Sequence, residues 1–215
     1  MSRLLLPLLL LPAVAAAAPP GEPVWSGLEA TIARSTWIVR AEVLAARPVG
    51  GIGTHVEVKV LETLQGPSGL ERCSYLTDPG RLVAPGEEEI LFLRPPAPGG
   101  AHHRVEGRVG GRSPFRREKL TWLRRVLELR ALPAGRRGKA FLSWYLEALR
   151  RRPPDWPFWR ALAEIERLRR ENPKELRALL PADALERAAE GLAEGQARRR
   201  LLDLARWRRE GAGPN

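Results

Sequence analysis

The spacing of apolar side chains changes once along this chain, and that change constrains the fold more than any other feature. As far as about residue 112, apolar and polar residues alternate, as they do in Trp37–Leu44 and Val56–Leu61. From Ser113 onward, apolar residues recur every three or four positions. Alternation places every second side chain on one face of a strand, whereas the longer spacing marks one face of a helix. We therefore expect an α+β protein in which a sheet-built module precedes a helical one.

Five short strands are expected in the first module. The glycine-rich turn at residues 50–53 joins the first two strands as a hairpin. The unbroken Ile-Leu-Phe-Leu run at 90–93 indicates a strand that is buried on both faces. Because closing a sheet removes its exposed edges, five short antiparallel strands favour a small barrel. The five candidates are residues 37–44, 56–65, 72–77, 89–93 and 103–109.

The second module has the pattern of a series of short amphipathic helices. Ser113-Pro114 fits the start of a helix that ends near Pro133. Asp155 is expected to cap a later helix, and Asn172 another, with Glu175 completing a capping box. Such short helices can bury their apolar stripes only against their neighbours in sequence, which favours a stacked array. The remaining candidates are residues 138–151, 155–172, 173–180, 182–192 and 196–209.

Several of these stretches also carry a family pattern. In the first module they are residues 38–43 (IVRAEV), 56–66 (VEVKVLETLQG) and 85–93 (PGEEEILFL). They resemble the N-terminal barrel of uncharacterised exported bacterial proteins, which is similar in outline to the OB-like barrel of netrin- and TIMP-type domains. Residues 141–147 (FLSWYLE) and 176–180 (LRALL) resemble the HEAT-like helical pairs that follow this barrel in some of them. The resemblance implies a small antiparallel five-stranded OB-like β-barrel followed by a short HEAT-like α-helical array, and it brings no catalytic residues.

The first residues have the three parts of a secretory signal peptide. A positive Met-Ser-Arg start precedes an apolar core at Leu4–Leu11 and then a run of alanines. A membrane span needs about 20 apolar residues, whereas this run stops after roughly 15. We expect cleavage after Ala16 or Ala17. The mature protein would then be exported, periplasmic or extracellular, with no integral membrane span.

The expected organisation follows from these patterns. The mature chain is long enough for one or two small domains with their own cores. The parts are a signal peptide at 1–17, a β-barrel domain at 18–112, a connecting helix at 113–133, a helical array at 134–210 and a disordered tail at 211–215.

The net charge of +11 is placed in the second half of the chain. Residues 19–112 hold 10 Lys and Arg against 11 Asp and Glu, whereas residues 113–215 hold 25 against 14. A basic surface attracts phosphate-bearing polymers and anionic lipid headgroups. Arginine far outnumbers lysine, and Ala, Gly, Pro and Leu are abundant, as in proteins of GC-rich genomes. Codon composition is therefore the alternative explanation of this charge.

Three arginine clusters in the helical module are the candidate polyanion contacts. One of them contains a tryptophan, and an arginine and aromatic cluster suits an anionic membrane surface or a nucleic acid. A last helix whose tryptophan packs back on the array explains this cluster equally well. The candidate residues are Arg150, Arg151, Arg152, Arg198, Arg199, Arg200, Arg206, Trp207, Arg208 and Arg209.

No sequence pattern marks a catalytic, cofactor or metal site. His55, His102 and His103 are the only histidines, and none has the ligand spacing of a zinc site. Adjacent residues on a strand point to opposite faces, so we expect a solvent-exposed pair at 102 and 103 and no metal ligands.

Cys73 is alone, whereas netrin-type domains have several cysteines, and we expect a small buried strand residue. Nucleophile elbows and phosphate-binding glycine loops are also missing from the sequence, so we expect no cofactor.

Tryptophan is frequent, with seven residues in the chain. Trp122, Trp144 and Trp159 fall on or beside the apolar stripes of three successive expected helices. We expect them to lie in the core of the array rather than to form a ligand platform.

These patterns favour an exported, non-catalytic binding or scaffold protein of the cell envelope. The alternative is a binder of polyanions or anionic membrane surfaces through the basic helical half. An envelope hydrolase is the least favoured, because the motifs that position a nucleophile beside a base are missing. The expected partner is an envelope protein or a polyanion, without specific nucleic-acid recognition.

Overall fold

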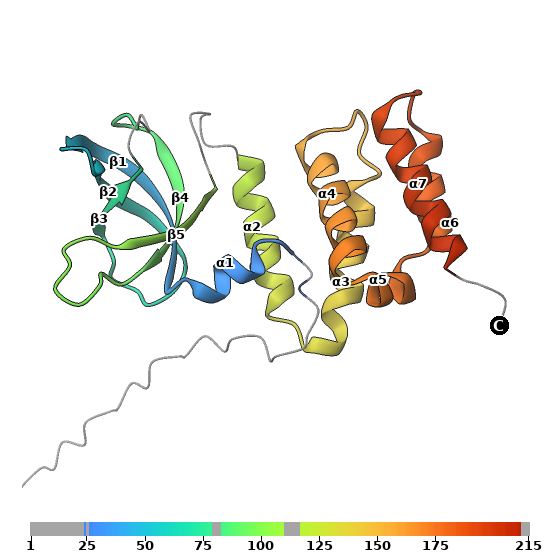
Figure 1. The fold of residues 1–215 in the computed structure, drawn as a ribbon, viewed down its shortest axis with the longest axis horizontal. Coiled ribbons are helices and arrows are strands. Elements are labelled where there is room, and N and C mark those ends of the chain that lie inside the picture. The colour runs from blue at the N-terminus through green and yellow to red at the C-terminus, as the bar shows by residue number, and fades with distance from the viewer. Residues whose placement is uncertain (1–23, 25, 79–82, 110–116, 212–215) are drawn as a thin grey trace, which may run out of the picture.

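The computed structural model describes residues 24, 26–78, 83–109 and 117–211 (Figure 1). The expected signal peptide at 1–17 lies outside these residues, as do most of the expected tail and the expected helix start at Ser113-Pro114.

The expected α+β architecture is confirmed (Figure 1). Among the described residues, a short helix precedes five strands, and six helices follow them. The first helix was not predicted, because its six residues are too few to show a helical period. The elements are α1 Glu29–Arg34, β1 Trp37–Val49, β2 Gly53–Gln65, β3 Arg72–Thr77, β4 Glu88–Arg94, β5 Arg104–Val109, α2 Arg117–Arg130, α3 Ala134–Ala148, α4 Trp156–Glu171, α5 Pro173–Leu179, α6 Ala182–Glu190 and α7 Gln196–Glu210.

The five strands form one antiparallel sheet with the order β3-β2-β1-β4-β5. The sheet curls so that its two outer strands approach each other. Tyr75 on β3 forms a parallel bridge with His103, the residue before β5. The His103 amide donates a 2.8 Å hydrogen bond to the carbonyl of Ser74. The expected five-stranded antiparallel barrel is therefore present as a half-barrel.

The curved sheet is buried on both faces at β4. Leu91 and Leu93 lie inside the curve with the valines of β1 and β2. Ile90 and Phe92 point the other way and join the core of the helices. The expected strand with two buried faces is confirmed, because the helical module covers the outside of the sheet at this strand.

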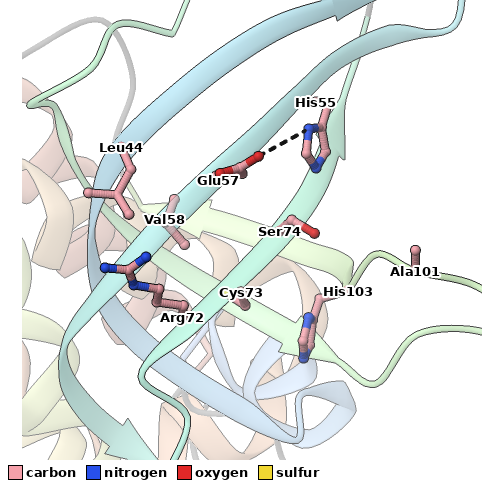
Figure 2. A pocket seen from close by; sticks show the side chains of 9 residues that line it. All are labelled: Leu44, His55, Glu57, Val58, Arg72, Cys73, Ser74, Ala101 and His103. Atoms are coloured by element: carbon pink, nitrogen blue, oxygen red, sulfur yellow. Dashed lines mark ion pairs between the residues drawn. The ribbon is translucent and has the colours of Figure 1, made fainter.

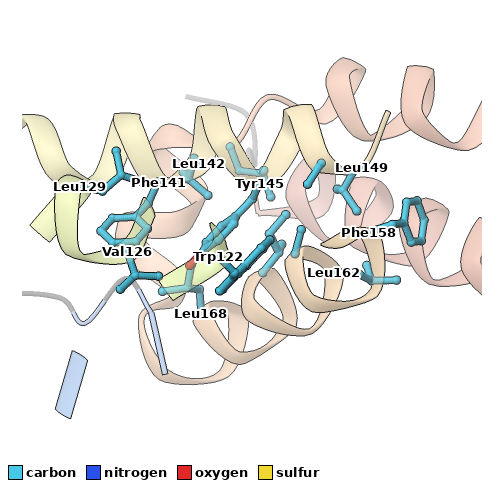
Figure 3. Packing of buried hydrophobic residues seen from close by; sticks show 14 of the residues in the cluster. Trp122, Val126, Leu129, Phe141, Leu142, Tyr145, Leu149, Phe158, Leu162 and Leu168 are labelled. Carbon is cyan, nitrogen blue, oxygen red and sulfur yellow. The ribbon is translucent and has the colours of Figure 1, made fainter. Parts of the chain in front are cut away.

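The helices continue from the sheet as a row (Figure 1). Helix α2 lies between the sheet and the remaining helices, and its Trp122 and Val126 pack into the same core as Phe141 and Tyr145 of α3 (Figure 3). Helices α3 and α4 form one contacting pair, and α6 and α7 form another. The short α5 connects the two pairs.

Several helix ends differ from expectation, among them the start of α3 and the cap of α5. Helix α3 begins at Ala134, whereas a start at Gly138 was expected. Gly138 is buried inside the helix, and its packing outweighs its low helix propensity. Asp155 does cap α4, where its carboxylate accepts a 3.2 Å hydrogen bond from the amide of Phe158. Asn172 precedes α5 as expected, but its side chain makes no capping hydrogen bond.

A candidate binding face on the barrel

An open pocket of about 360 Å³ lies on the outside of β2 and β3 (Figure 2). Strands β2 and β3 supply most of its walls, β1 supplies one residue, and the loop before β5 closes one side. The lining residues are Leu44, His55, Glu57, Val58, Arg72, Cys73, Ser74, Ala101 and His103.

The register between β2 and β3 brings the polar side chains of this face together. Glu57 lies opposite Ser74, and Lys59 lies opposite Arg72. Side chains two residues apart on a strand share a face, so His55, Glu57 and Lys59 project to the same side of β2. The alternate residues Val56 and Val58 are buried in the core. One face of β2 thus holds the sheet together while the other remains available for contacts.

All three histidines gather beside this pocket. The His102 ring lies 4.6 Å from the His55 ring, measured between centroids, and its Nδ1 is 2.9 Å from Ser74 Oγ. The His103 ring instead packs edge-on against Trp37 at 5.6 Å. The two adjacent histidines therefore point in different directions, as expected. They are partly buried, however, so the expected solvent-exposed pair is wrong: each ring is covered by a side chain from a distant part of the sequence.

His103 is the histidine whose protonation is disfavoured by the fold. Burial lowers the pKa of its imidazole below 6.5, and its backbone hydrogen bond with Ser74 opposes this shift. Its buried Nδ1 has no hydrogen-bond partner among the described residues. The ring is therefore neutral at physiological pH and acts as part of the wall.

Cys73 is a partly buried strand residue with a free thiol. Burial raises the pKa of this thiol to about 11. The thiol stays protonated at neutral pH, which makes it a poor nucleophile. This agrees with the expected inert role.

Two basic side chains of this face have no acidic partner. Neither Arg72 nor Lys59 forms an ion pair within the part of the chain that the structure describes, and both are exposed. Glu57 lies 3.9 Å from Nδ1 of His55, which is a loose contact. Arg72 therefore places a positive charge in the pocket wall, which Glu57 also lines, and Leu44 supplies apolar surface.

Four of the nine candidate polyanion arginines contact acidic residues of the protein itself. Arg151 pairs with Asp155 at 2.5 Å, and Arg209 pairs with Glu186 at 2.6 Å. Arg198 lies 3.4 Å from Glu194. Arg200 binds Glu166 through two guanidinium nitrogens, and this hydrogen bonding raises the pKa of Arg200.

Other members of this set contact backbone or aromatic groups. Arg152 donates hydrogen bonds to the carbonyls of Ala188 and Gly191 at the end of α6, at 2.5 and 3.1 Å. Arg208 donates to the carbonyl of Leu180 at 2.9 Å. The partly buried ring of Trp207 faces two guanidinium groups, those of Arg169 at 5.2 Å and Arg177 at 4.6 Å.

The three remaining candidates are also exposed. Arg150, Arg199 and Arg206 form no ion pair with any residue that the structure describes. Arg199 and Arg206 are seven residues apart and so share a face of α7, where Asp203 and Glu210 lie between and beyond them. That face alternates in sign, which weakens its attraction for a polyanion.

The expected position in the core is confirmed for two of the three tryptophans. Trp122 is 4% exposed and packs against Trp144 with centroids 4.0 Å apart and the ring planes tilted by 40°. Trp159 is 37% exposed, so its expected core position is wrong. Its neighbour Phe158 occupies the buried position of that helical turn, and Trp159 lies on the outside near Arg200.

Two buried carboxylates lie away from the pocket. Glu89 is 3% exposed and accepts a hydrogen bond from the hydroxyl of Tyr75 inside the sheet. Glu164 is 2% exposed and pairs with Arg160 and Arg167 on its own helix. Because each is hydrogen-bonded within the protein, neither points to a bound ligand.

The described residues contain no group of three His, Cys, Asp or Glu side chains arranged to hold a metal ion. Among the described helices, none combines the length and apolar character that crossing a bilayer requires.

No protein-family model and no curated protein matches the chain.

The pocket itself was not visible in the sequence. His55 and His102 lie far apart in the sequence. Ser74 and Arg72 belong to no recognisable sequence motif. Only the β2–β3 register and the path of the loop at 95–103 bring these residues together.

Proposed function

We propose that the protein is an exported, non-catalytic binding protein of the cell envelope. In this proposal the β-module carries the ligand site and the helical module is a scaffold that holds it. Export rests on the signal-peptide pattern at 1–17.

The proposal includes an OB-like identity for the sheet and a HEAT-like identity for the helices. The sheet order, with β1 paired to both β2 and β4, supports the first. So does the parallel approach of β3 to the start of β5. An OB barrel is a five-stranded, partly open barrel that binds ligands on its second and third strands and adjoining loops. The contacting pairs α3 with α4 and α6 with α7 support the second identity.

The observation that carries the proposed function is the pocket on β2 and β3. It combines apolar surface with the cation of Arg72, which forms no ion pair among the described residues, whereas most candidate arginines of the helical half are engaged within the protein. This combination suits a small ligand, or a chain end, that has an anionic group beside an apolar part. Phenyl phosphate is a simple probe of that chemistry.

The test is a titration of the ¹⁵N-labelled mature chain with phenyl phosphate, followed by NMR. We expect shifts confined to β2, β3 and the loop at 95–103, with affinity reduced about tenfold in Arg72→Ala. Arg104→Ala is the matched control, because Arg104 is an exposed arginine on the neighbouring β5 that does not line the pocket. Absent shifts, or equal losses in both variants, would reject the ligand site.

The polyanion alternative depends on the exposed Arg150, Arg199 and Arg206. A heparin hexasaccharide in the same experiment tests it. Shifts on α7 and at the end of α3 that fade steeply with added salt would favour this alternative. Shifts limited to the barrel face would count against it.

The hydrolase alternative has one supporting contact. Ser74 lies beside His102, and a hydroxyl beside a base is what a nucleophile requires. Turnover of p-nitrophenyl acetate that disappears in Ser74→Ala would favour a hydrolase and contradict the non-catalytic proposal.

A further inference from the structure

Two imidazoles from distant parts of the chain meet at one end of the pocket. His55 comes from β2 and His102 from the loop before β5, and their ring centroids are 4.6 Å apart with the planes tilted by 49°. In the sequence His102 is adjacent to His103, and no metal site was expected there. The observed pairing with His55 changes the argument, because two imidazoles in proximity are a common pair of metal ligands.

Nδ1 of His102 is within hydrogen-bond distance of an oxygen of the protein, whereas Nδ1 of His55 lies near a carboxylate beyond that distance. Nδ1 of His102 is 2.9 Å from Ser74 Oγ, and Nδ1 of His55 is 3.9 Å from a carboxylate oxygen of Glu57. A metal-bound histidine usually donates its other N–H to such an oxygen, which fixes the tautomer and the ring orientation. This arrangement leaves Nε2 of both rings for a metal. Within the residues that the structure describes, neither Nε2 has a hydrogen-bond partner.

The charges around the two rings decide which metals fit. Arg47 lies opposite His55 across the β1–β2 register, and Arg72 lines the same pocket. Glu57 is the acidic side chain nearest to His55. With two cations and one carboxylate nearby, the site does not attract a cation by net charge. Binding must come from the nitrogen lone pairs, which favours late first-row ions such as Zn²⁺ and Cu²⁺ over Mg²⁺ and Ca²⁺.

We propose that His55 and His102 bind a divalent late first-row transition metal through their Nε2 atoms, with Ser74 orienting the ring of His102. Two protein ligands leave the other coordination positions to water or to a donor oxygen of a bound ligand. The inference is independent of the proposed function, because metal binding is measured with the metal alone.

Zn²⁺ binding to the untagged mature chain, measured by calorimetry, is the first test. His55→Ala and His102→Ala should each weaken binding at least about tenfold, as expected when a metal site loses a ligand. The matched control is His103→Ala, which removes the adjacent histidine and should leave the affinity unchanged. Ca²⁺ should give no heat. No Zn²⁺ binding, or equal losses in all three variants, would overturn the proposal.

A second measurement keeps the test valid if a variant fails to fold. In the wild-type chain, Zn²⁺ should shift the imidazole ¹⁵N resonances of Nε2 in His55 and His102 while Nδ1 keeps its proton. Cu²⁺ should give an electron paramagnetic resonance spectrum with two equivalent nitrogen ligands. Shifts at His103, or a spectrum without nitrogen couplings, would contradict the assignment.

Discussion

The amide of Gly27 donates a 3.0 Å hydrogen bond to the buried carboxylate of Glu164, a residue 137 positions later on α4. Arg167 reinforces this contact, because it binds the same carboxylate at 2.9 Å and also the carbonyl of Val24 at 2.9 Å. Helix α1, which follows this segment, contacts β4 and β5. The residues before α1 therefore tie the helical module to the sheet.

Glu164→Gln should destabilise the protein. The substitution leaves Arg167, whose side chain is 15% exposed, without its buried partner, and breaking such a pair costs about 3 kcal/mol. Urea denaturation measures the loss. Glu171→Gln is the control, because Glu171 also binds Arg167 but is 53% exposed, and surface pairs contribute about 0–1 kcal/mol. Equal effects of the two variants would mean that burial of Glu164 is not what matters.

Cys73 should react slowly with iodoacetamide. Burial raises its thiol pKa to about 11 from 9.0, so the thiolate fraction at pH 8 is about 100-fold lower than in an unfolded chain. Because the raised pKa belongs to the folded state, its contribution to stability is complete below pH 9 and is lost as the pH rises toward 11. Alkylation rates at pH 8, with and without urea, check the first statement. A rate like that of the unfolded chain would contradict it.

The folded protein should lose stability in acid because of His103. Burial lowers the pKa of its imidazole below 6.5, so the unfolded chain takes up a proton before the folded one does. The stabilisation is present above pH 6.5 and is lost as the pH falls through the folded-state value. Urea midpoints between pH 7.5 and 5 measure this loss, which should be smaller in His103→Asn. An unchanged slope in that variant would assign the acid sensitivity to other groups.

How far the sequence predicts this structure depends on whether a feature is local. Alternation and helical spacing are local, so the strands and the helices after residue 117 were predicted, and Asp155 was correctly assigned as a cap. Register is not local, so the meeting of His55 with His102 was not predictable. A sequence shows that an arginine is charged but not what it contacts. Arg200 and Arg152 therefore looked like surface charges, although they bind Glu166 and the end of α6.

Arg152 should be needed for stability and not for polyanion binding. Its guanidinium donates hydrogen bonds to the carbonyls of Leu149, Ala188 and Gly191 at 2.9, 2.5 and 3.1 Å, and so it links the end of α3 to the end of α6. The last carbonyls of a helix lack partners within the helix, and a cation there also interacts favourably with the helix dipole.

Arg152→Ala should therefore lower the free energy of unfolding by about 1.5 kcal/mol. Arg152→Lys should restore little of this free energy, because an ammonium group cannot reproduce the planar arrangement of N–H donors of a guanidinium. Arg150→Ala is the matched control, since Arg150 is exposed and two residues away, and its effect should stay within about 0.5 kcal/mol. Thermal unfolding measures stability, and heparin affinity chromatography of the same variants measures polyanion binding. If Arg152→Ala elutes earlier from heparin yet unfolds at the wild-type temperature, Arg152 is a surface contact and its capping role is wrong.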